Sequence, residues 1–217
     1  MIIAIDGPAA SGKTSTAKKL AEKLSYTHLN SGLMYRALTY VFLIENCIND
    51  FSKNLNILLK KIKFTGKNLN TVYYNNENIT DYLYSEQINS NIKFISNNKK
   101  IRKNLILLQR KLVENKNVVC EGRDIGSVVF PNAEFKFYLE ADINVRALRR
   151  YKQLKNDLSI DEIKKNIVSR DFNDKNRNIS PLIKTSDCII VDTTEMTITK
   201  QVEYLYSTII NQDKKWQ

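Results

Sequence analysis

Short apolar runs alternate with longer amphipathic stretches along most of this chain. The runs predict strands at residues 2–6, 27–29, 118–121, 135–139 and 188–192. Stretches with apolar residues at helical spacing predict helices over 14–24, 33–45, 99–114, 143–154, 160–172 and 198–210. Because short apolar strands separated by helices are typical of a parallel sheet covered on both faces, the pattern predicts an α/β doubly wound fold.

Two segments interrupt this alternation. Residues 62–84 contain short β-forming runs separated by polar turns, which predicts a small antiparallel insertion. Residues 146–177 are hydrophilic and rich in arginine, which indicates a lid that can close over phosphate groups. We therefore expect a sheet flanked by helices, with one β insertion and one mobile lid.

The junction between the first predicted strand and helix carries the strongest chemical signal. The segment from Gly7 to Thr14 matches the phosphate-loop pattern G-x-x-x-x-G-K-[ST] without a gap. Backbone N–H groups of such a loop converge on phosphate oxygens, and the following helix adds the positive end of its dipole. We expect the Lys13 ammonium to reach the β- and γ-phosphates of a nucleoside triphosphate, and the Thr14 hydroxyl to bind Mg²⁺.

Composition limits the class of protein. With 217 residues, of which 42% are hydrophobic, the chain is long enough for one packed core. No apolar run reaches the length of a membrane span, and the first residues are typical of a strand rather than a signal peptide. The three cysteines are far apart and odd in number, which favours reduced residues and a cytoplasmic location.

The net charge of +11 leaves two interpretations open. A polyanion such as RNA could be a partner, which would make the chain a nucleotide-gated RNA-binding protein. Alternatively, lysines scattered over solvated helix faces and a positive cleft for two nucleotides explain the same charge. Because the chain offers no compact basic-aromatic recognition motif, we expect small nucleotides and no nucleic acid as partners.

Polar and charged residues follow two predicted strands at their carboxyl ends, where α/β sheets bind ligands. After the second strand come Ser31, which can cap the next helix, and Arg36, which can face an acceptor phosphate. After the third come Arg123 and Asp124, enclosed by two glycines; a surface ion pair is the alternative. Glu121 ends that strand where Mg²⁺ and its waters are expected.

The alternating charges of residues 169–177 are most often a solvated helix end. Because the segment precedes the last strand, it could also return to the cleft. Asp174 is then a candidate for binding ribose hydroxyls, and Arg170 and Arg177 could serve sugar, phosphate or base. Arg102 stands alone on a predicted helix, where an arginine is usually on the surface.

Four motifs, taken in order, resemble those of the bacterial cytidylate kinase (CMP kinase) family. They lie at residues 5–13, 30–36, 121–131 and 170–182. The similarity extends over nearly the whole chain, and the Gly-Arg-Asp-Ile-Gly motif and the Arg-Asp…Asn-Arg…Pro-Leu motif are far more specific than the phosphate loop. The resemblance implies phosphorylation of CMP and dCMP by ATP, with Mg²⁺ as cofactor and direct in-line transfer.

The resemblance also implies roles for individual residues. ATP would be bound by Gly7, Pro8, Ala9, Ala10, Ser11, Gly12, Lys13, Thr14, Ser15 and Thr193. CMP would be bound by Ser31, Arg36, Arg102, Arg123, Asp124, Arg170, Asp174 and Arg177. Catalytic charge would come from Lys13, Arg123, Arg146, Arg149 and Arg150. In this set Arg102 and Asp124 face the cytosine, which changes the surface interpretation of Arg102.

The chain departs from the family pattern at a few positions. Asn30 stands where the family usually has Asp, Lys93 replaces a serine that often contacts cytosine, and the usual Arg-Thr-Pro after the insertion reads Tyr84-Ser85-Glu86. A proline expected near Lys99 is absent. All of these positions fall in or beside the expected monophosphate-binding region, so they bear on selectivity for the acceptor.

One nucleoside monophosphate kinase domain is therefore expected over residues 1–217. Its core would comprise 1–30, 100–145 and 178–217, its monophosphate-binding region 31–99, and its lid 146–177. We expect a monomer. The alternatives are a phosphate-loop kinase for another acceptor, such as UMP or AMP, and the RNA-binding protein mentioned above.

Overall fold

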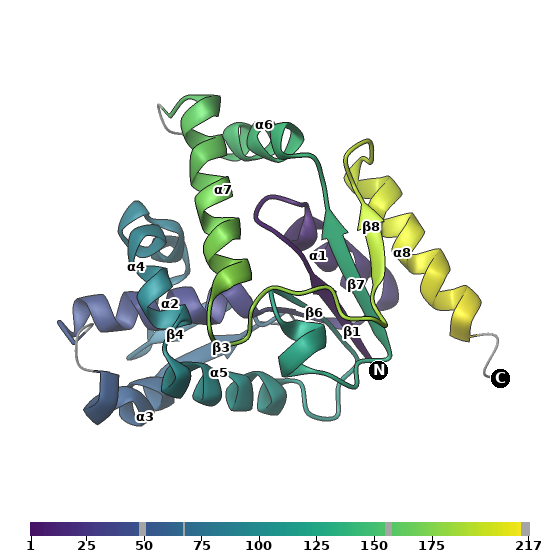
Figure 1. Cartoon of the computed structure of the whole chain (residues 1–217). Helices are drawn as coiled ribbons and strands as arrows, with labels where there is room; N and C mark the ends of the chain where they lie inside the picture. The colour runs from purple at the N-terminus through teal and green to yellow at the C-terminus, as the bar shows by residue number, and fades with distance from the viewer. Residues whose placement is uncertain (48–50, 67, 155–157, 214–217) are drawn as a thin grey trace. The chain divides into compact units, whose positions relative to one another are not determined.

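The computed structural model describes residues 1–47, 51–66, 68–154 and 158–213. Figure 1 labels the helices, which are α1 (Lys13–Leu24), α2 (Ser31–Ile44), α3 (Phe51–Lys61), α4 (Glu86–Ser96), α5 (Lys99–Leu112), α6 (Ile143–Gln153), α7 (Ile160–Asn176) and α8 (Ile198–Asp213). The strands are β1 (Ile2–Asp6), β2 (Thr27–Asn30), β3 (Ile62–Thr65), β4 (Thr71–Tyr74), β5 (Glu77–Asn78), β6 (Val118–Gly122), β7 (Phe135–Glu140) and β8 (Ile189–Asp192). Two shorter turns are the 3₁₀ helix η1 (Thr80–Tyr84) and the π-helical turn η2 (Ile125–Val129).

The larger sheet has the strand order β2-β6-β1-β7-β8. Strand β1 pairs in parallel with β6 on one side and with β7 on the other, and β7 pairs in parallel with β8. Ile3, Ala4 and Ile5 are almost completely buried, as expected for a central strand with both faces covered. The predicted doubly wound α/β fold and the five strands predicted for it are confirmed, with strand ends that differ by a residue or so.

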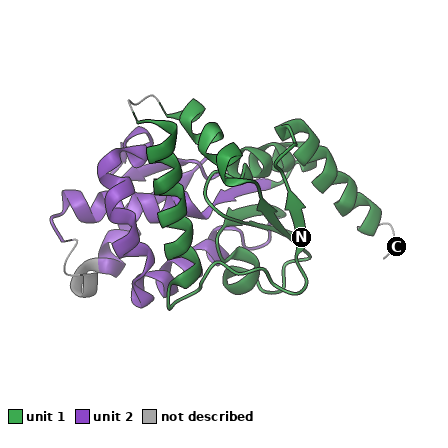
Figure 2. Cartoon of the chain, turned by 45° about the horizontal axis from the view of Figure 1, so that its top comes forward, with its two compact units in different colours: residues 1–26, 117–217 green, residues 27–116 purple. Residues whose placement is uncertain are grey.

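Contacts divide the chain into two compact units, coloured in Figure 2. Unit 1 comprises residues 1–26 and 117–217, and unit 2 comprises residues 27–116. The predicted division by role into a core, a monophosphate-binding region and a lid stays a prediction. Of those ranges, residues 48–50, 67, 155–157 and 214–217 lie outside the part of the chain that the structure describes.

The core of unit 1 forms where α1 and α8 pack on the sheet. Leu20 of α1 and Leu205 of α8 are completely buried together with Ile3, Ile5 and Leu139. Complete burial of one such side chain contributes about 1.5–3 kcal/mol relative to leaving it in water. This core anchors the carboxyl ends of β1 and β7, from which the loops of the candidate site emerge.

Unit 2 contains the predicted antiparallel insertion. Strands β3, β4 and β5 form a three-stranded antiparallel sheet, and η1 follows it in place of a further β run. Helix α4 was not predicted, because its sequence is rich in Asn and Ser and only Ile88 and Ile95 on it are buried. Helix α3 was not predicted either.

The segment predicted to be a lid contains a longer helix than the sequence indicated. Helix α7 was expected to end at Phe172, but it continues to Asn176. Its start is fixed by a capping box between Ser159 and Glu162. Among the helices that the structure describes, none is long and apolar enough to cross a membrane.

Candidate active site

The loop between β1 and α1 adopts a conformation that its glycines make possible. Gly7 and Gly12 have φ angles of 149° and 93°, and Ala10 between them is also left-handed at 59°. A Cβ at Gly7 would lie 2.0 Å from the carbonyl oxygen of Leu139, so no other residue fits there. The loop leads directly into the N-terminus of α1, which begins at Lys13. This is the geometry of an anion-binding loop.

Lys13 is buried against its own loop. Its Nζ donates hydrogen bonds to the carbonyl oxygen of Pro8 at 2.5 Å and to Oγ of Ser11 at 3.3 Å. Burial lowers the pKa of Lys13 well below its usual value, Arg123 lowers it further, and Glu121 partly opposes both. A phosphate arriving beside this amine would therefore stabilise its charged form.

Thr14, in the first turn of α1, is adjacent to a carboxylate. Its Oγ1 donates a hydrogen bond of 2.9 Å to Oε2 of Glu121, which is buried at the end of β6. A hydroxyl and a carboxylate oxygen together are the hard donors that Mg²⁺ prefers, alongside phosphate oxygens and water. No cluster of three or more His, Cys, Asp or Glu suited to a metal occurs among the residues described. Thr14 and Glu121 therefore fit a metal ion whose other ligands come mainly from a bound nucleotide.

Asp6 connects the end of β1 to the loop that follows β6, a role that the sequence analysis missed. Its two carboxylate oxygens accept hydrogen bonds from the backbone N–H groups of Ile125 at 2.9 Å and Gly126 at 2.8 Å. Burial raises the pKa of Asp6 to about 6, although these two bonds and Lys13 act to lower it. Asp6 thus fixes the position of the loop that carries Arg123.

The charged residues of that loop meet those of α7. The Nε of Arg123 donates to Oδ2 of Asp174 at 2.8 Å, and a guanidinium nitrogen of Arg177 lies 3.6 Å from Oδ1 of Asp124. Burial alone would raise the pKa of Asp174, but Arg123, Arg170 and Arg177 hold it below its usual value. Five predicted acceptor-binding residues of unit 1 therefore form one charged group, and the alternative of a surface ion pair at Arg123 does not fit its burial.

Thr193 reaches the backbone of the phosphate loop. Its completely buried Oγ1 lies 3.1 Å from the carbonyl oxygen of Ser11 and 3.0 Å from that of Glu140, and it accepts from Arg149 at 3.1 Å. Arg149 also donates to the carbonyl oxygen of Thr193. The Thr193 side chain is thus part of the wall behind the phosphate loop.

A second polar residue behind the loop was missed by the sequence analysis. Gln201 of α8 is completely buried, accepts a hydrogen bond of 2.6 Å from Oγ1 of Thr16, and donates to the carbonyl oxygen of Met196. Its amide would lie 2.9 Å from a Cβ built on Gly12. A glutamine on an amphipathic helix gives no local signal of this contact, since its partner is 185 residues away.

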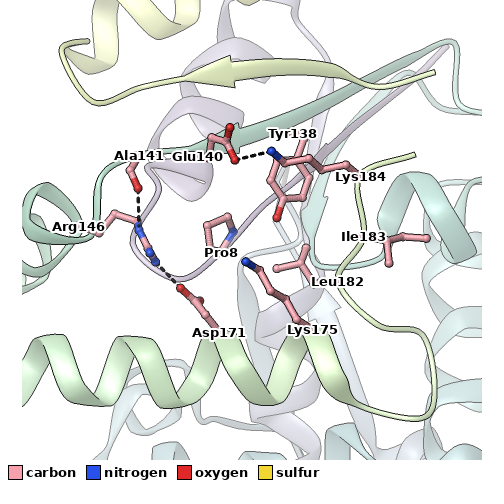
Figure 3. A pocket seen from close by; sticks show the side chains of 10 residues that line it. All are labelled: Pro8, Tyr138, Glu140, Ala141, Arg146, Asp171, Lys175, Leu182, Ile183 and Lys184. Atoms are coloured by element: carbon pink, nitrogen blue, oxygen red, sulfur yellow. Dashed lines mark hydrogen bonds and ion pairs between the residues drawn. The ribbon is translucent and has the colours of Figure 1, made fainter. Parts of the chain in front are cut away.

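The three lid arginines of the prediction have different surroundings. Arg146 on α6 donates to the carbonyl oxygens of Ala141 and Ala9 and pairs with Asp171 of α7. Burial lowers the pKa of Arg149 and Arg150 from the usual arginine value. Figure 3 shows Arg146 and Asp171 in the wall of a pocket of about 440 Å³ beside Pro8. The sequence analysis missed Asp171.

In unit 2 the predicted residues Arg36 and Arg102 are both buried, each over an aromatic ring. Arg36 donates to the carbonyl oxygen of Leu83 at 3.0 Å and lies 5.0 Å from the ring centre of Tyr84. Arg102 is only 2% exposed, donates to the carbonyl oxygen of Ser96, and lies 5.4 Å from the ring centre of Tyr35. The surface position suggested for Arg102 by its isolation in the sequence is wrong.

The cap of α2 is not the predicted one. Ser31 is the first residue of the helix, and the residue before it, Asn30, accepts a hydrogen bond from the N–H of Leu33. Asn30, one of the departures from the family pattern, is therefore the N-cap, a position for which asparagine is well suited. Ser31 itself is buried.

Known proteins are similar to this chain over nearly its whole length. The family model described as cytidylate kinase matches residues 3–211. The chain is 40% identical over 213 residues to the cytidylate kinase of Fusobacterium nucleatum, covering 96% of this chain and 97% of that one. It is 41% identical over 206 residues to the cytidylate kinase of Halalkalibacterium halodurans, covering 92% and 93% of the two chains.

Among solved structures, the crystal structure of TT1252 from Thermus thermophilus is similar in fold. The TM-score is 0.50 at 15% identity, covering 98% of this chain and 97% of that one. This structural similarity shows a shared fold only. The match to the family model and the sequence identity to two cytidylate kinases show common descent. On those two findings, the chain belongs to the cytidylate kinase family.

Proposed function

We propose that this protein transfers the γ-phosphoryl group of ATP to CMP and dCMP, giving CDP and dCDP by direct in-line displacement. The observation that carries the proposal is membership of the cytidylate kinase family over residues 3–211. The buried lysine in a glycine-bounded loop supports it, because this is where a triphosphate donor would bind.

The donor would be held by the loop from Gly7 to Gly12 and by the first residues of α1, including Ser15. Thr193 would lie near the adenine. The Lys13 amine now hydrogen-bonded to Pro8 would move to the β- and γ-phosphates. Thr14, with Glu121 beside it, would help to hold Mg²⁺, which when bound neutralises phosphate charge.

Residues with proposed acceptor-binding roles occur in unit 1 and in unit 2. In unit 1, Arg123 would bind the phosphate of CMP, Asp124 would contact the cytosine with Arg177 nearby, and Arg170 and Asp174 would bind the sugar. Hydrogen bonds and ion pairs already order the side chains of Arg123, Asp124, Asp174 and Arg177 without ligand, which supports these roles. Arg170 joins them through its charge, which helps to hold the pKa of Asp174 below its usual value.

In unit 2, Ser31 and Arg36 would bind the acceptor phosphate and Arg102 would read the cytosine. Burial of both arginines over aromatic rings supports fixed side chains of this kind. Lys93 is exposed and lies 5.3 Å from the ring centre of its neighbour Phe94, and we propose no contact between it and cytosine.

Phosphoryl transfer needs positive charge around the moving group rather than a covalent intermediate. Lys13 and Arg123 would supply that charge from unit 1, together with Arg149 and Arg150 of α6. Arg123 and Arg149 are already held by hydrogen bonds to Asp174 and Thr193, which supports this role, since charges that need little rearrangement stabilise a transition state most strongly.

The test is a coupled assay of ADP release from ATP with Mg²⁺ and each nucleoside monophosphate in turn. We expect CMP and dCMP to give kcat/KM values at least about tenfold above those of UMP and AMP. Faster reaction with UMP or AMP would assign the chain to another acceptor. Salt-dependent RNA binding without release of ADP for any monophosphate would replace the proposal by the RNA-binding alternative.

A cytoplasmic location and a monomeric state complete the proposal. Size-exclusion chromatography with light scattering, with and without nucleotides, tests the second of these. A mass of 25.2 kDa is expected, and twice that value would contradict it.

A further inference from the structure

The peptide groups on both sides of Ala9, in the phosphate loop, are held from outside the loop. The N–H of Ala9 donates to Oδ1 of Asp171 at 2.8 Å, and its carbonyl oxygen accepts from Arg146 at 3.0 Å. Arg146 and Asp171 also bond to each other, as Figure 3 shows. The three residues therefore form a closed hydrogen-bonded triangle, which we call the Ala9 clamp.

The clamp joins three elements of unit 1 that are distant in sequence. Arg146 is on α6, and Asp171 is on α7, 162 residues from Ala9. Both charged side chains are almost completely buried, and the Nε of Arg146 is further held by the carbonyl oxygen of Ala141. Charge-assisted hydrogen bonds of this kind, shielded from water, are among the strongest in proteins.

Apolar packing fixes the same point. The methyl group of Ala9 belongs to a small buried cluster with Ala147 of α6 and with Ile163 and Ile167 of α7. The tip of the phosphate loop is therefore part of the core of the α6–α7 pair. A shift of these helices would move the loop, and a shift of the loop would disturb the helices.

The next residue explains why a clamp is needed. Ala10 has a φ angle of 59°, a left-handed conformation that is unfavourable for an alanine because its Cβ comes too close to the following carbonyl oxygen. Such conformations persist only when their surroundings over-determine them. With the Ala9 peptide groups released, Ala10 would relax, and the N–H groups that follow would turn away from their common target.

We propose that Arg146 and Asp171 are positioning residues, which hold the phosphate loop in the strained conformation that nucleotide binding requires. In this role Arg146 acts through Ala9 and not on the transferring phosphate, which differs from the role expected from its sequence. The part of the inference that concerns ATP rests on the proposed function. The part that concerns the Ala9 clamp itself does not.

The first test uses the nucleotide-free protein. Asp171→Asn keeps the side-chain volume but turns an NH₂ group toward the Arg146 donors, and Arg146→Lys keeps the charge without the forked geometry. Hydrogen exchange measured by NMR should show the Ala9 amide exchanging at least about tenfold faster in both variants, the scale of one lost charge-assisted bond. The amides of Ile3 and Ile5 should not change.

The matched control is Ser159→Ala. It removes the N-terminal cap of α7, in which the Ser159 hydroxyl accepts from the N–H of Glu162, without touching the Ala9 clamp. A general loosening of α7 would accelerate Ala9 exchange in this control as well, and that result would overturn the proposal. We expect the control to leave Ala9 exchange unchanged.

The second test is kinetic and uses Ala10→Gly as a background, since glycine adopts the left-handed conformation without cost. Asp171→Asn should raise the KM for ATP by about tenfold, with a smaller effect on kcat, and the increase should be several-fold smaller when combined with Ala10→Gly. An equal increase in both backgrounds, or a fall in kcat with unchanged KM, would overturn the proposal. A chain inactive toward CMP would refute the proposed function and leave the exchange result standing.

Discussion

The buried carboxyl group of Asp6 gives a quantitative prediction. Its pKa is raised from 3.8 to about 6, chiefly because burial disfavours the charged form. A carboxyl group whose pKa is higher in the folded than in the unfolded chain stabilises the fold most at low pH. This contribution is present in full below about pH 3.8 and is lost as the pH rises through about 6.

The size of the effect follows from the two pKa values. The difference between 3.8 and about 6 corresponds to roughly 3 kcal/mol in total, of which roughly 2 kcal/mol is lost between about pH 4.5 and 7. Asp6→Asn removes this titration. The free energy of unfolding of the wild type, minus that of the variant, should therefore fall by about 2 kcal/mol over this range.

The assay is urea denaturation of nucleotide-free protein at several pH values, with both proteins measured in parallel. Groups that titrate alike in both proteins cancel in the difference. Glu134→Gln is the matched control, because Glu134 accepts a hydrogen bond from the backbone N–H of Ile2 at the start of β1 but is exposed. This control shows how much the free energy of unfolding depends on pH when the carboxyl group removed is an exposed one.

A difference that stays constant from about pH 4.5 to 7 would refute the reasoning for Asp6. A difference that increases with pH would be more informative. It would mean that Lys13 and the two N–H donors, from Ile125 and Gly126, outweigh burial and hold the pKa below its usual value.

Three further substitutions test the site. Lys13→Ala should lower kcat by about 10²-fold or more, because one positive charge at the transferring phosphoryl group is lost. Lys18→Ala, on the exposed face of α1, should leave kcat unchanged, and equal kcat values for the two variants in steady-state kinetics would refute the role of Lys13. Arg102→Ala should reduce the ratio of kcat/KM for CMP to that for UMP by about tenfold or more, and an unchanged ratio would show that Arg102 does not read the base. Gly7→Ala should abolish the cooperative unfolding transition, since its Cβ would lie 2.0 Å from a carbonyl oxygen of β7, while Gly32→Ala, 3.2 Å from a side-chain oxygen, should retain it; calorimetry decides between them.

The sheet and the phosphate loop could be predicted because their signals are local. The run over residues 2–5 is apolar throughout, as expected for a central strand with both faces covered, and the glycines and lysine that follow have fixed spacing. Helix α4 lacked such a signal, since two buried isoleucines seven residues apart do not make a pattern. The extension of α7 beyond Phe172 was missed because its alternating charges are also typical of a helix end.

The supporting residues of the site could not be predicted for a different reason. Asp6, Asp171 and Gln201 each form a hydrogen bond with a residue more than 100 positions away in the sequence. The partners of Asp6 and Asp171 in these bonds are backbone N–H groups, which every residue except proline has, so the sequence does not mark them. Asp171 adjoins Arg170 in a segment of alternating charges, and nothing in the sequence separates it from its neighbours. Its role becomes visible only in the structure, where the N–H of Ala9 donates to it. The residues expected to touch nucleotides are recognisable by motif, whereas those that hold them in place become visible only in the fold.

The contacts of Thr193 and Gln201 have a consequence for protein synthesis. The phosphate loop is translated long before its partners, because Thr193 follows Ser11 by 182 residues and Gln201 follows Thr16 by 185 residues. A nascent chain on the ribosome therefore carries this loop without its rear wall until Thr193 and Gln201 have been added. ATP should give such a chain little help in folding until α8 has emerged from the ribosomal exit tunnel.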